Sequence, residues 1–228
     1  MSNLTVAVIG PEAYAQELGK KGTSSDFTFY NLKKGNNTIT FLEPTRYPER
    51  LASLFFSVSM ASRAIVVVDE VNASFGECVV MLDCAGIRDG FLVLRNYITP
   101  EQIAPLIRDT VVAHYQVVPD DRMKIRELLT AQVEAIREPE QVKDHGAVPV
   151  DHFFNVKGIG VVVLGEVVEG RIVRHETLRI HPTKKTGLVR SIQKHDDDAA
   201  YAVPGDRVGL ALKGVETEDL DRGYVLSA

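Results

Sequence analysis

The chain has 228 residues, which is enough for one or two domains. Its 26 Lys and Arg residues against 31 Asp and Glu residues give a formal net charge of −5, which excludes a protein that binds nucleic acid over its whole surface. No apolar run approaches the roughly 18–20 residues of a membrane helix, and the N-terminus lacks a signal-peptide pattern. We therefore expect a cytoplasmic protein without a membrane partner.

The two cysteines, Cys78 and Cys84, are too few for a disulfide framework, and their spacing is not that of a zinc site. They fall in a segment of helical character, and we expect both to be small core residues on different helix faces. No group of His, Cys or carboxylate residues has metal-ligand spacing, so no metal site is expected.

The first part of the chain alternates between strand and helix patterns. Short apolar runs predict buried strands at residues 4–9, 38–42, 64–69 and 90–94. Helical patterns predict helices at residues 48–60, 76–85, 100–114 and 120–136, the last with Asp120 as its N-cap. This alternation predicts an α/β domain with a parallel sheet and flanking helices over residues 1–140.

The pattern changes after residue 140. Residues 141–147 are polar and predict a linker. From residue 148 to 228, β-branched runs alternate with Gly, Pro and Asp turns, and no helical period appears. The runs predict strands at residues 160–168, 176–180, 187–192, 207–212 and 224–226. Short strands at this spacing predict a small closed β-barrel.

Three segments of this second part carry a family resemblance. They are Val148–Gly165, with Val-Asp-His-Phe-Phe-Asn-Val near its start, Val189–His195 (Val-Arg-Ser-Ile-Gln-Lys-His) and Pro204–Gly209 (Pro-Gly-Asp-Arg-Val-Gly). Over residues 148–228 the chain resembles domain II of elongation factor Tu and of the selenocysteine-specific factor SelB. The resemblance implies an all-β domain II barrel, preceded by an α/β domain of the P-loop-GTPase type, in a protein of translation.

The first part resembles the G domain of that family in a degenerate form. Val6–Gly10 is similar to the strand that enters the phosphate loop, and Thr40–Glu43 to the strand that ends in a metal-side Asp. Gly19–Asp26 looks like a segment of the methanogen factor EF-Pyl, which implies an archaeal source. The family's third domain has no counterpart, so we expect either a truncated chain or a shortened paralogue.

The phosphate-loop positions have lost their chemistry. A phosphate loop needs G-x4-G-K-[ST], in which the Lys neutralises phosphate charge and the hydroxyl holds Mg²⁺. Counted from Gly10, the last three positions of that motif hold Ala15, Gln16 and Glu17. The cation is missing and a carboxylate replaces the hydroxyl, so a triphosphate would be repelled.

The other nucleotide motifs have also changed. The family's D-x-P-G-H reads Glu43-Pro44-Thr45-Arg46-Tyr47, in which Glu43 could still assist a metal and Tyr47 replaces the water-orienting His. The guanine-reading N-K-x-D reads Arg95-Asn96-Tyr97-Ile98, so the Asp that reads guanine is lost. Ser24 alone still matches the switch threonine. We expect a pseudo-GTPase without GTP or Mg²⁺, with Tyr14, Tyr47 or Tyr97 filling the empty pocket.

The resemblance implies that the barrel contacts the 3′ end of aminoacyl-tRNA and the ribosome. The family positions correspond here to Asp151, His152, Phe154, Gln193, His195 and Arg207. Phe154 could stack on a base or an aminoacyl group, and Arg207 could reach a phosphate. A core position for Phe154 and a turn-capping role for Asp151 stay open as alternatives.

A basic cluster lies near two predicted strands of the barrel: Arg179, His181, Lys184, Lys185, Arg190 and Lys194. It could hold RNA phosphates, or it could be a solvated barrel edge that lysines protect from pairing. The adjacent acidic run Asp196–Asp198 would repel RNA and weakens the first interpretation.

Three functions follow as hypotheses. The first is a binding module for aminoacyl-tRNA or another RNA, the ribosome or another translation factor, with a G domain that needs no nucleotide. The second is a divergent GTPase that binds GTP despite its altered motifs. The third is a protein-interaction scaffold that does not bind RNA. The oligomeric state does not follow from the sequence.

Overall fold

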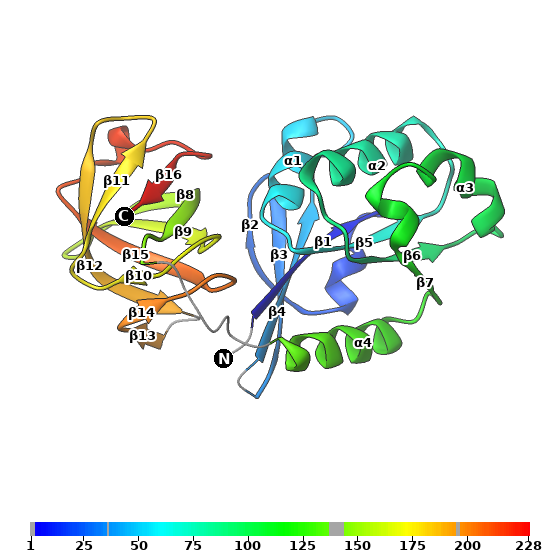
Figure 1. Cartoon of the computed structure of the whole chain (residues 1–228), viewed down its shortest axis with the longest axis horizontal. Coiled ribbons are helices and arrows are strands. Elements are labelled where there is room, and N and C mark those ends of the chain that lie inside the picture. Colours follow the sequence, from blue (N-terminus) through cyan, green and yellow to red (C-terminus); the bar gives the residue numbers. More distant parts are fainter. Residues whose placement is uncertain (1–2, 36, 137–143, 195–196) are drawn as a thin grey trace. The chain divides into compact units, whose positions relative to one another are not determined.

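The computed structural model describes residues 3–35, 37–136, 144–194 and 197–228. The chain forms two compact units, residues 1–136 and 137–228, and each is described by itself (Figure 1). The first unit is an α/β domain with a mostly parallel sheet and the second is an all-β barrel. The predicted fold class is therefore confirmed.

The first unit is built on a seven-stranded sheet with the order β2-β3-β4-β1-β5-β6-β7. The strands are β1 (Asn3–Ile9), β2 (Lys20–Ser24), β3 (Phe27–Lys34), β4 (Asn37–Pro44), β5 (Arg63–Val68), β6 (Gly90–Leu94) and β7 (Gln116–Val118). β4, β1, β5, β6 and β7 are parallel, whereas β2 and β3 join antiparallel at the β4 side. The carboxyl ends of the parallel strands share one edge, where ligands bind in open α/β sheets.

Helices cover both faces of this sheet (Figure 1). They are α1 (Leu51–Ser59), α2 (Ala73–Ala85), α3 (Pro100–Ile107) and α4 (Arg122–Ala135), with the 3₁₀ turns η1 (Tyr14–Glu17) and η2 (Val111–His114). β5 shows why both faces need cover. Val66 and Val68 pack with α1, α2 and α3, whereas Ile65 and Val67 pack with α4 and η1. Alternating side chains point to opposite faces, so an all-apolar strand must be buried twice.

The second unit is a closed barrel. Its strands are β8 (Ala147–Val156), β9 (Gly160–Glu166), β10 (Ile172–Val173), β11 (Thr177–His181), β12 (Thr186–Lys194), β13 (Asp197–Ala199), β14 (Tyr201–Ala202), β15 (Arg207–Lys213) and β16 (Val225–Ser227), with the 3₁₀ turn η3 (Thr217–Asp219). The main sheet has the order β11-β16-β8-β9-β15-β12-β13, and pairing of β11 with β12 closes it. Gly158 and Gly160 supply the positive φ angles (84° and 105°) of the tight β8–β9 turn.

Several local expectations from the sequence are wrong. The helix expected over 100–114 ends at Ile107, and η2 follows it. The N-cap of α4 is Asp121, whose side chain accepts from the N–H groups of Met123 and Lys124, and not Asp120. Cys78 is buried as expected, but Cys84 is exposed. The β2–β3 hairpin was not predicted, because β2 is exposed along its whole length and lacks the apolar alternation that marks a strand.

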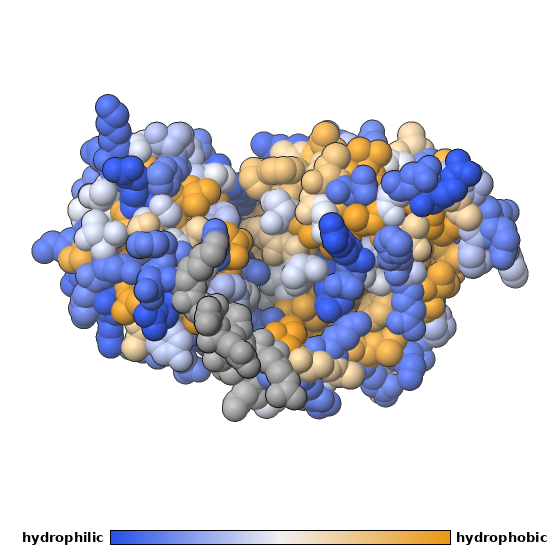
Figure 2. All heavy atoms as spheres, viewed as in Figure 1, coloured by the Kyte–Doolittle hydropathy of each residue, from blue (hydrophilic) through white to orange (hydrophobic). Residues whose placement is uncertain are grey.

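The surface of the α/β unit carries most of the exposed large apolar side chains, including Leu51, Phe55 and Leu106. Figure 2 shows apolar side chains gathered over this unit, whereas the barrel is mostly hydrophilic on the face in view. Within the described ranges, no helix is both long and apolar enough to cross a membrane.

Candidate functional site

The loop after β1 forms an anion cradle, and the chain itself supplies the anion. All residues between β1 and β2 are described, and they form one 3₁₀ turn instead of the α-helix that follows a phosphate loop. Ala13 precedes this turn in the left-handed conformation, with φ 63° and ψ 16°. Its N–H and that of Ala15 donate to the two carboxylate oxygens of Glu43, at 2.7 and 2.6 Å. Backbone N–H groups gathered in this way are a common anion site.

Glu43 is buried at the end of β4. Burial raises the pKa of its carboxyl group, and the hydrogen bonds from Ala15 and Ala13 act in the opposite direction. A metal ion at Glu43 would have to compete with these two N–H donors for the same oxygens. Among the described residues, no group of three or more His, Cys, Asp or Glu side chains is placed to hold a metal.

The remaining phosphate-loop positions differ in their exposure and partners. Ala15 is buried, whereas Gln16 and Glu17 are exposed. The Glu17 carboxylate lies 3.6 Å from the guanidinium of Arg122. Gly10 packs tightly against β5, because a Cβ atom there would lie 2.6 Å from Cβ of Val67. The glycine that opens the family's loop is thus used here for close packing.

A polar network centred on Asp120 lies beside this turn. The Tyr14 hydroxyl donates to Oδ1 of Asp120 at 2.9 Å, and Nε of Arg95 donates to Oδ2 at 2.8 Å. Arg122 also pairs with Asp120, and its guanidinium carbon lies 4.0 Å above the Tyr14 ring. Burial and the hydrogen bond to Asp120 raise the pKa of Tyr14, so its hydroxyl stays a donor. Tyr14 is buried by these contacts.

The altered guanine-reading segment is hydrogen-bonded to Asp69, the residue that directly follows β5. Arg95 reaches Asp69 with Nη1 to Oδ1 at 3.2 Å, and Asn96 donates its Nδ2 to the Asp69 carbonyl at 2.9 Å. Asn96 and Tyr97 both have positive φ angles, of 52° and 62°. Tyr97 is completely exposed, so the expectation that it fills the pocket is wrong.

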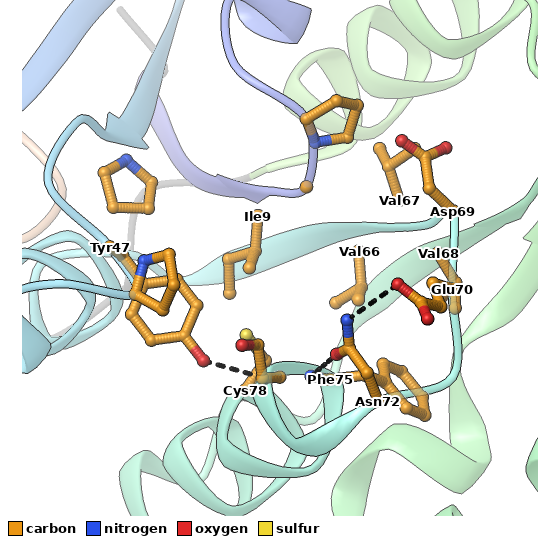
Figure 3. Close-up of a pocket in the computed structure, with 15 residues that line it drawn as sticks. Ile9, Tyr47, Val66, Val67, Val68, Asp69, Glu70, Asn72, Phe75 and Cys78 are labelled. Carbon is orange, nitrogen blue, oxygen red and sulfur yellow. Dashed lines mark hydrogen bonds between the residues drawn. The ribbon is translucent and has the colours of Figure 1, made fainter.

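Tyr47 and Ser24, the two other altered or retained motif positions, lie in different parts of the α/β unit: Tyr47 beside α2 and Ser24 on β2. The Tyr47 hydroxyl lies 2.8 Å from the carbonyl oxygen of Ser74 and 2.9 Å from the carboxylate of Glu77, at the start of α2. Its ring lines a cavity of about 320 Å³ at the carboxyl edge of the sheet (Figure 3). Ser24 is in the exposed edge strand β2 and bonds Oγ1 of Thr28 at 2.8 Å.

In the barrel, Asp151 and Arg207 bind each other. Asp151 is buried and pairs with the Arg207 guanidinium, while Nε of Arg222 donates to the Asp151 carbonyl at 2.8 Å. Burial raises the pKa of Asp151, and the positive charge of Arg207 opposes that rise. The pair joins β8 to β15, so both residues have a structural role.

Other predicted barrel residues lie on one outer face. The strand registers place His152, Leu164, Gly209 and Gln193 in one row across β8, β9, β15 and β12. Phe154 lies two residues after His152 on β8, on the same face of the strand. It is 40% exposed, and its ring centroid lies 6.1 Å from that of the His152 ring. Gly209 contributes no side chain to this row, and the atoms nearest to an added Cβ there would belong to Leu164, Gln193 and Val162, at 3.5–4.0 Å. His195 is outside the described residues.

Four of the six residues of the basic cluster are already engaged, among them His181, whose Nε2 lies 3.0 Å from Oγ of Ser227. Lys185 pairs with Asp219 at 3.2 Å, Lys194 pairs with buried Asp206, and Arg190 donates to the Ile159 carbonyl at 3.0 Å. Sequence reasoning missed the Asp120 network and the row of His152, Leu164, Gly209 and Gln193. The first joins distant residues that share no motif, and the second depends on strand register.

Comparison with known proteins agrees with this architecture. A family model for elongation factor Tu domain 2 matches residues 160–227. The uncharacterized protein MJ0325 of Methanocaldococcus jannaschii is 40% identical over 232 aligned positions, which cover 100% of this chain and 73% of that protein. The selenocysteine-specific elongation factor of the same organism is 25% identical over 231 positions, covering 93% of this chain.

The chain belongs to the elongation factor Tu/SelB-like family of translation factors. The fold of this family member matches the crystal structure of SelB from Methanococcus maripaludis in complex with the GTP analogue GPPNHP, with a TM-score of 0.80 and 21% identity. That match covers 100% of this chain and 55% of SelB. The chain thus spans about half the length of that SelB, and 49% of the selenocysteine-specific factor.

Proposed function

We propose that this chain is a binding module of the elongation factor Tu/SelB-like family that works without a nucleotide and holds the 3′ end of an aminoacyl-tRNA on its barrel. The observation that carries the proposal is the carboxylate of Glu43 in the N–H cradle of Ala13 and Ala15. A phosphate that entered this cradle would have to displace a buried carboxylate of the same charge. The crystallised SelB relative was solved with a GTP analogue, so a GTP-binding chain is the main alternative.

The surroundings of the cradle also oppose nucleotide binding. The motif position that should hold a Lys is Gln16, which is exposed, and the next residue is the acidic Glu17. On the guanine side, Arg95 is engaged with Asp120 and Asp69, and Ile98 has no group that could accept from guanine. Arg95 and Asn96, the polar side chains of the altered guanine-reading segment, are already hydrogen-bonded within the chain, so binding guanine through them would break these contacts.

The outer face of the barrel offers what an RNA end needs. Phe154 presents a partly exposed ring beside the imidazole of His152, and aromatic rings of this kind stack on unpaired bases. Gln193 lies opposite Gly209 in the strand register and carries both a donor and an acceptor for a ribose hydroxyl, with one amide hydrogen bond to Asp198 at 3.3 Å.

The test is binding of fluorescently labelled aminoacyl-tRNA to the purified chain, with the deacylated tRNA in parallel. We expect the aminoacylated form to bind more tightly. Phe154→Ala should weaken binding about tenfold, since stacking of one base contributes about 1–3 kcal/mol. Gly209→Ala should weaken it several-fold by adding a methyl group to the row beside Gln193. The nearest atoms to an added Cβ there lie 3.5 Å away or more, so the substitution leaves the fold intact.

Ile159→Ala is the matched control. Ile159 is an exposed apolar residue of the same barrel, in the β8–β9 turn and outside the row of His152 and Gln193. Its removal should leave tRNA binding unchanged. Equal binding by wild type, Phe154→Ala and Gly209→Ala, or no binding above that of an unrelated acidic protein, would contradict the proposed role of the barrel.

A further inference from the structure

The cavity of about 320 Å³ in the α/β unit lies at the carboxyl ends of β1, β4 and β5, beside the start of α2 (Figure 3). Its walls are largely apolar: Ile9, Val66 and Val68 come from the strands, and Phe75 comes from α2. A pocket of this size at the strand ends of an open sheet is suited to a small molecule.

The polar groups of the cavity are acidic or neutral. Asp69 and Glu70 are its two carboxylates, and no Lys or Arg is among the described residues that line it. Tyr47 and Cys78 stay protonated at neutral pH: burial raises the pKa of both groups, that of Cys78 to about 11. The ionised groups of the lining are therefore all negative.

The two carboxylates differ in whether a cationic side chain of the described residues pairs with them. Asp69 has a partner outside the lining, because Nη1 of Arg95 lies 3.2 Å from its Oδ1. Glu70 accepts one hydrogen bond, from Nδ2 of Asn72 at 3.3 Å, and no cationic side chain of the described residues pairs with it. The negative potential of the cavity is thus centred on Glu70, and a low-dielectric apolar wall strengthens its effect on a bound charge.

We propose that this cavity binds an organic cation, with an ammonium group beside Glu70 and an apolar body between Tyr47 and Phe75. The apolar walls bury the body of such a ligand, and the carboxylate selects the charge. A phosphate or carboxylate ligand would be repelled by Glu70. All residues that line this cavity belong to the α/β unit. The outcome of the tRNA-binding test on the barrel therefore does not decide whether the cavity binds a cation.

The experiment is isothermal titration calorimetry of the full chain with phenethylammonium chloride. Phenethyl alcohol and phenylacetate serve as neutral and anionic probes of nearly the same shape. We expect the cation to bind with a Kd of about 1 mM or below. The alcohol should bind at least about tenfold more weakly, and phenylacetate should give no measurable heat. Equal binding of all three probes, preference for the anion, or no binding of the cation would each overturn the proposal.

Glu70→Gln locates the site. Glu70 is exposed, so its replacement leaves the core intact. The variant should lose at least about tenfold in affinity for phenethylammonium and keep its affinity for phenethyl alcohol. The matched control is Glu127→Gln, which removes an exposed carboxylate from α4 and should change neither affinity. Unchanged cation affinity in Glu70→Gln would show that Glu70 does not select the charge and would refute the assignment.

Discussion

The carboxylate of Glu43 accepts the backbone N–H of Ala15 at 2.6 Å, and its other oxygen accepts that of Ala13 at 2.7 Å. In a phosphate loop, N–H groups of the loop backbone bind the phosphates of a nucleotide. Here a side chain from the end of β4 occupies such a group of donors. The α/β unit therefore supplies an anion to its own cradle.

Removal of this internal anion should expose an anion site. Glu43→Ala leaves the buried N–H of Ala15 and the part-buried N–H of Ala13 without their acceptor, and we expect a loss of about 1–3 kcal/mol in the free energy of unfolding. Formate or phosphate should restore part of that stability by entering the vacated cradle. Urea unfolding with and without these anions measures both effects. Glu12→Ala, a change at an exposed neighbour, should show neither; an anion-insensitive Glu43→Ala would contradict the cradle.

The raised pKa of Glu43 gives a pH dependence with a defined sign. A carboxyl group whose pKa is higher in the folded state binds its proton more tightly there, so its contribution to stability falls as the pH rises through that pKa. Wild type should therefore gain stability relative to Glu43→Gln as the pH is lowered from 7 toward the ordinary value of 4.5. Unfolding of both proteins at several pH values checks this. A difference that stays constant or shrinks toward low pH would refute it.

The Asp151–Arg207 ion pair should stabilise the barrel by joining β8 to β15. Arg207→Ala leaves a carboxylate that is almost fully buried without its cation, and breaking such a pair costs about 3–5 kcal/mol. The double variant Asp151→Asn/Arg207→Ala should recover part of this loss, because no buried charge remains. Thermal or urea unfolding of wild type, Asp151→Asn, Arg207→Ala and the double variant gives the coupling energy of the pair. Arg179→Ala, on the exposed side of β11, is the control and should be close to neutral.

The two cysteines should differ sharply in reactivity. Burial raises the pKa of Cys78 to about 11, so little of its thiolate exists at neutral pH, whereas Cys84 is exposed. Iodoacetamide at pH 8 should modify Cys84 first and Cys78 only after unfolding in urea, as read by peptide mass spectrometry. Modification of Cys78 at the rate of Cys84 in the native protein would mean that the cavity wall around Tyr47 opens.

The fold class was predictable because the buried strands of this chain appear in the sequence as short apolar runs. The all-apolar run of β5 indicated a doubly covered strand, and the β-branched runs at residues 160–168 and 207–212 indicated the barrel strands β9 and β15. The edge strand β2 has no apolar run or alternation that would predict it, since all of its side chains are exposed. Local signals also misplaced the N-cap of α4, because Asp120 and Asp121 are both suitable and only tertiary contacts with Tyr14 and Arg95 separate their roles.

The candidate site was predictable only in part. Motif positions identified Ala15, Gln16 and Glu43 as altered, but not that Glu43 would bind the backbone of Ala15, which depends on the spatial approach of β4 to η1. Likewise Asp151 and Arg207 were assigned separately to RNA, and only the fold shows that they pair. Gln193 and His152 share a face because of strand register, which the sequence does not specify.

The central claim is that the α/β unit works without a nucleotide. Its most direct test is titration of the purified chain with a fluorescent GTP analogue and Mg²⁺, with GDP and ATP as competitors. We predict no guanine-specific binding at high micromolar protein, for wild type and for Glu43→Gln alike. Micromolar binding that GDP displaces and ATP does not would contradict the account and identify the chain as a divergent GTP-binding factor.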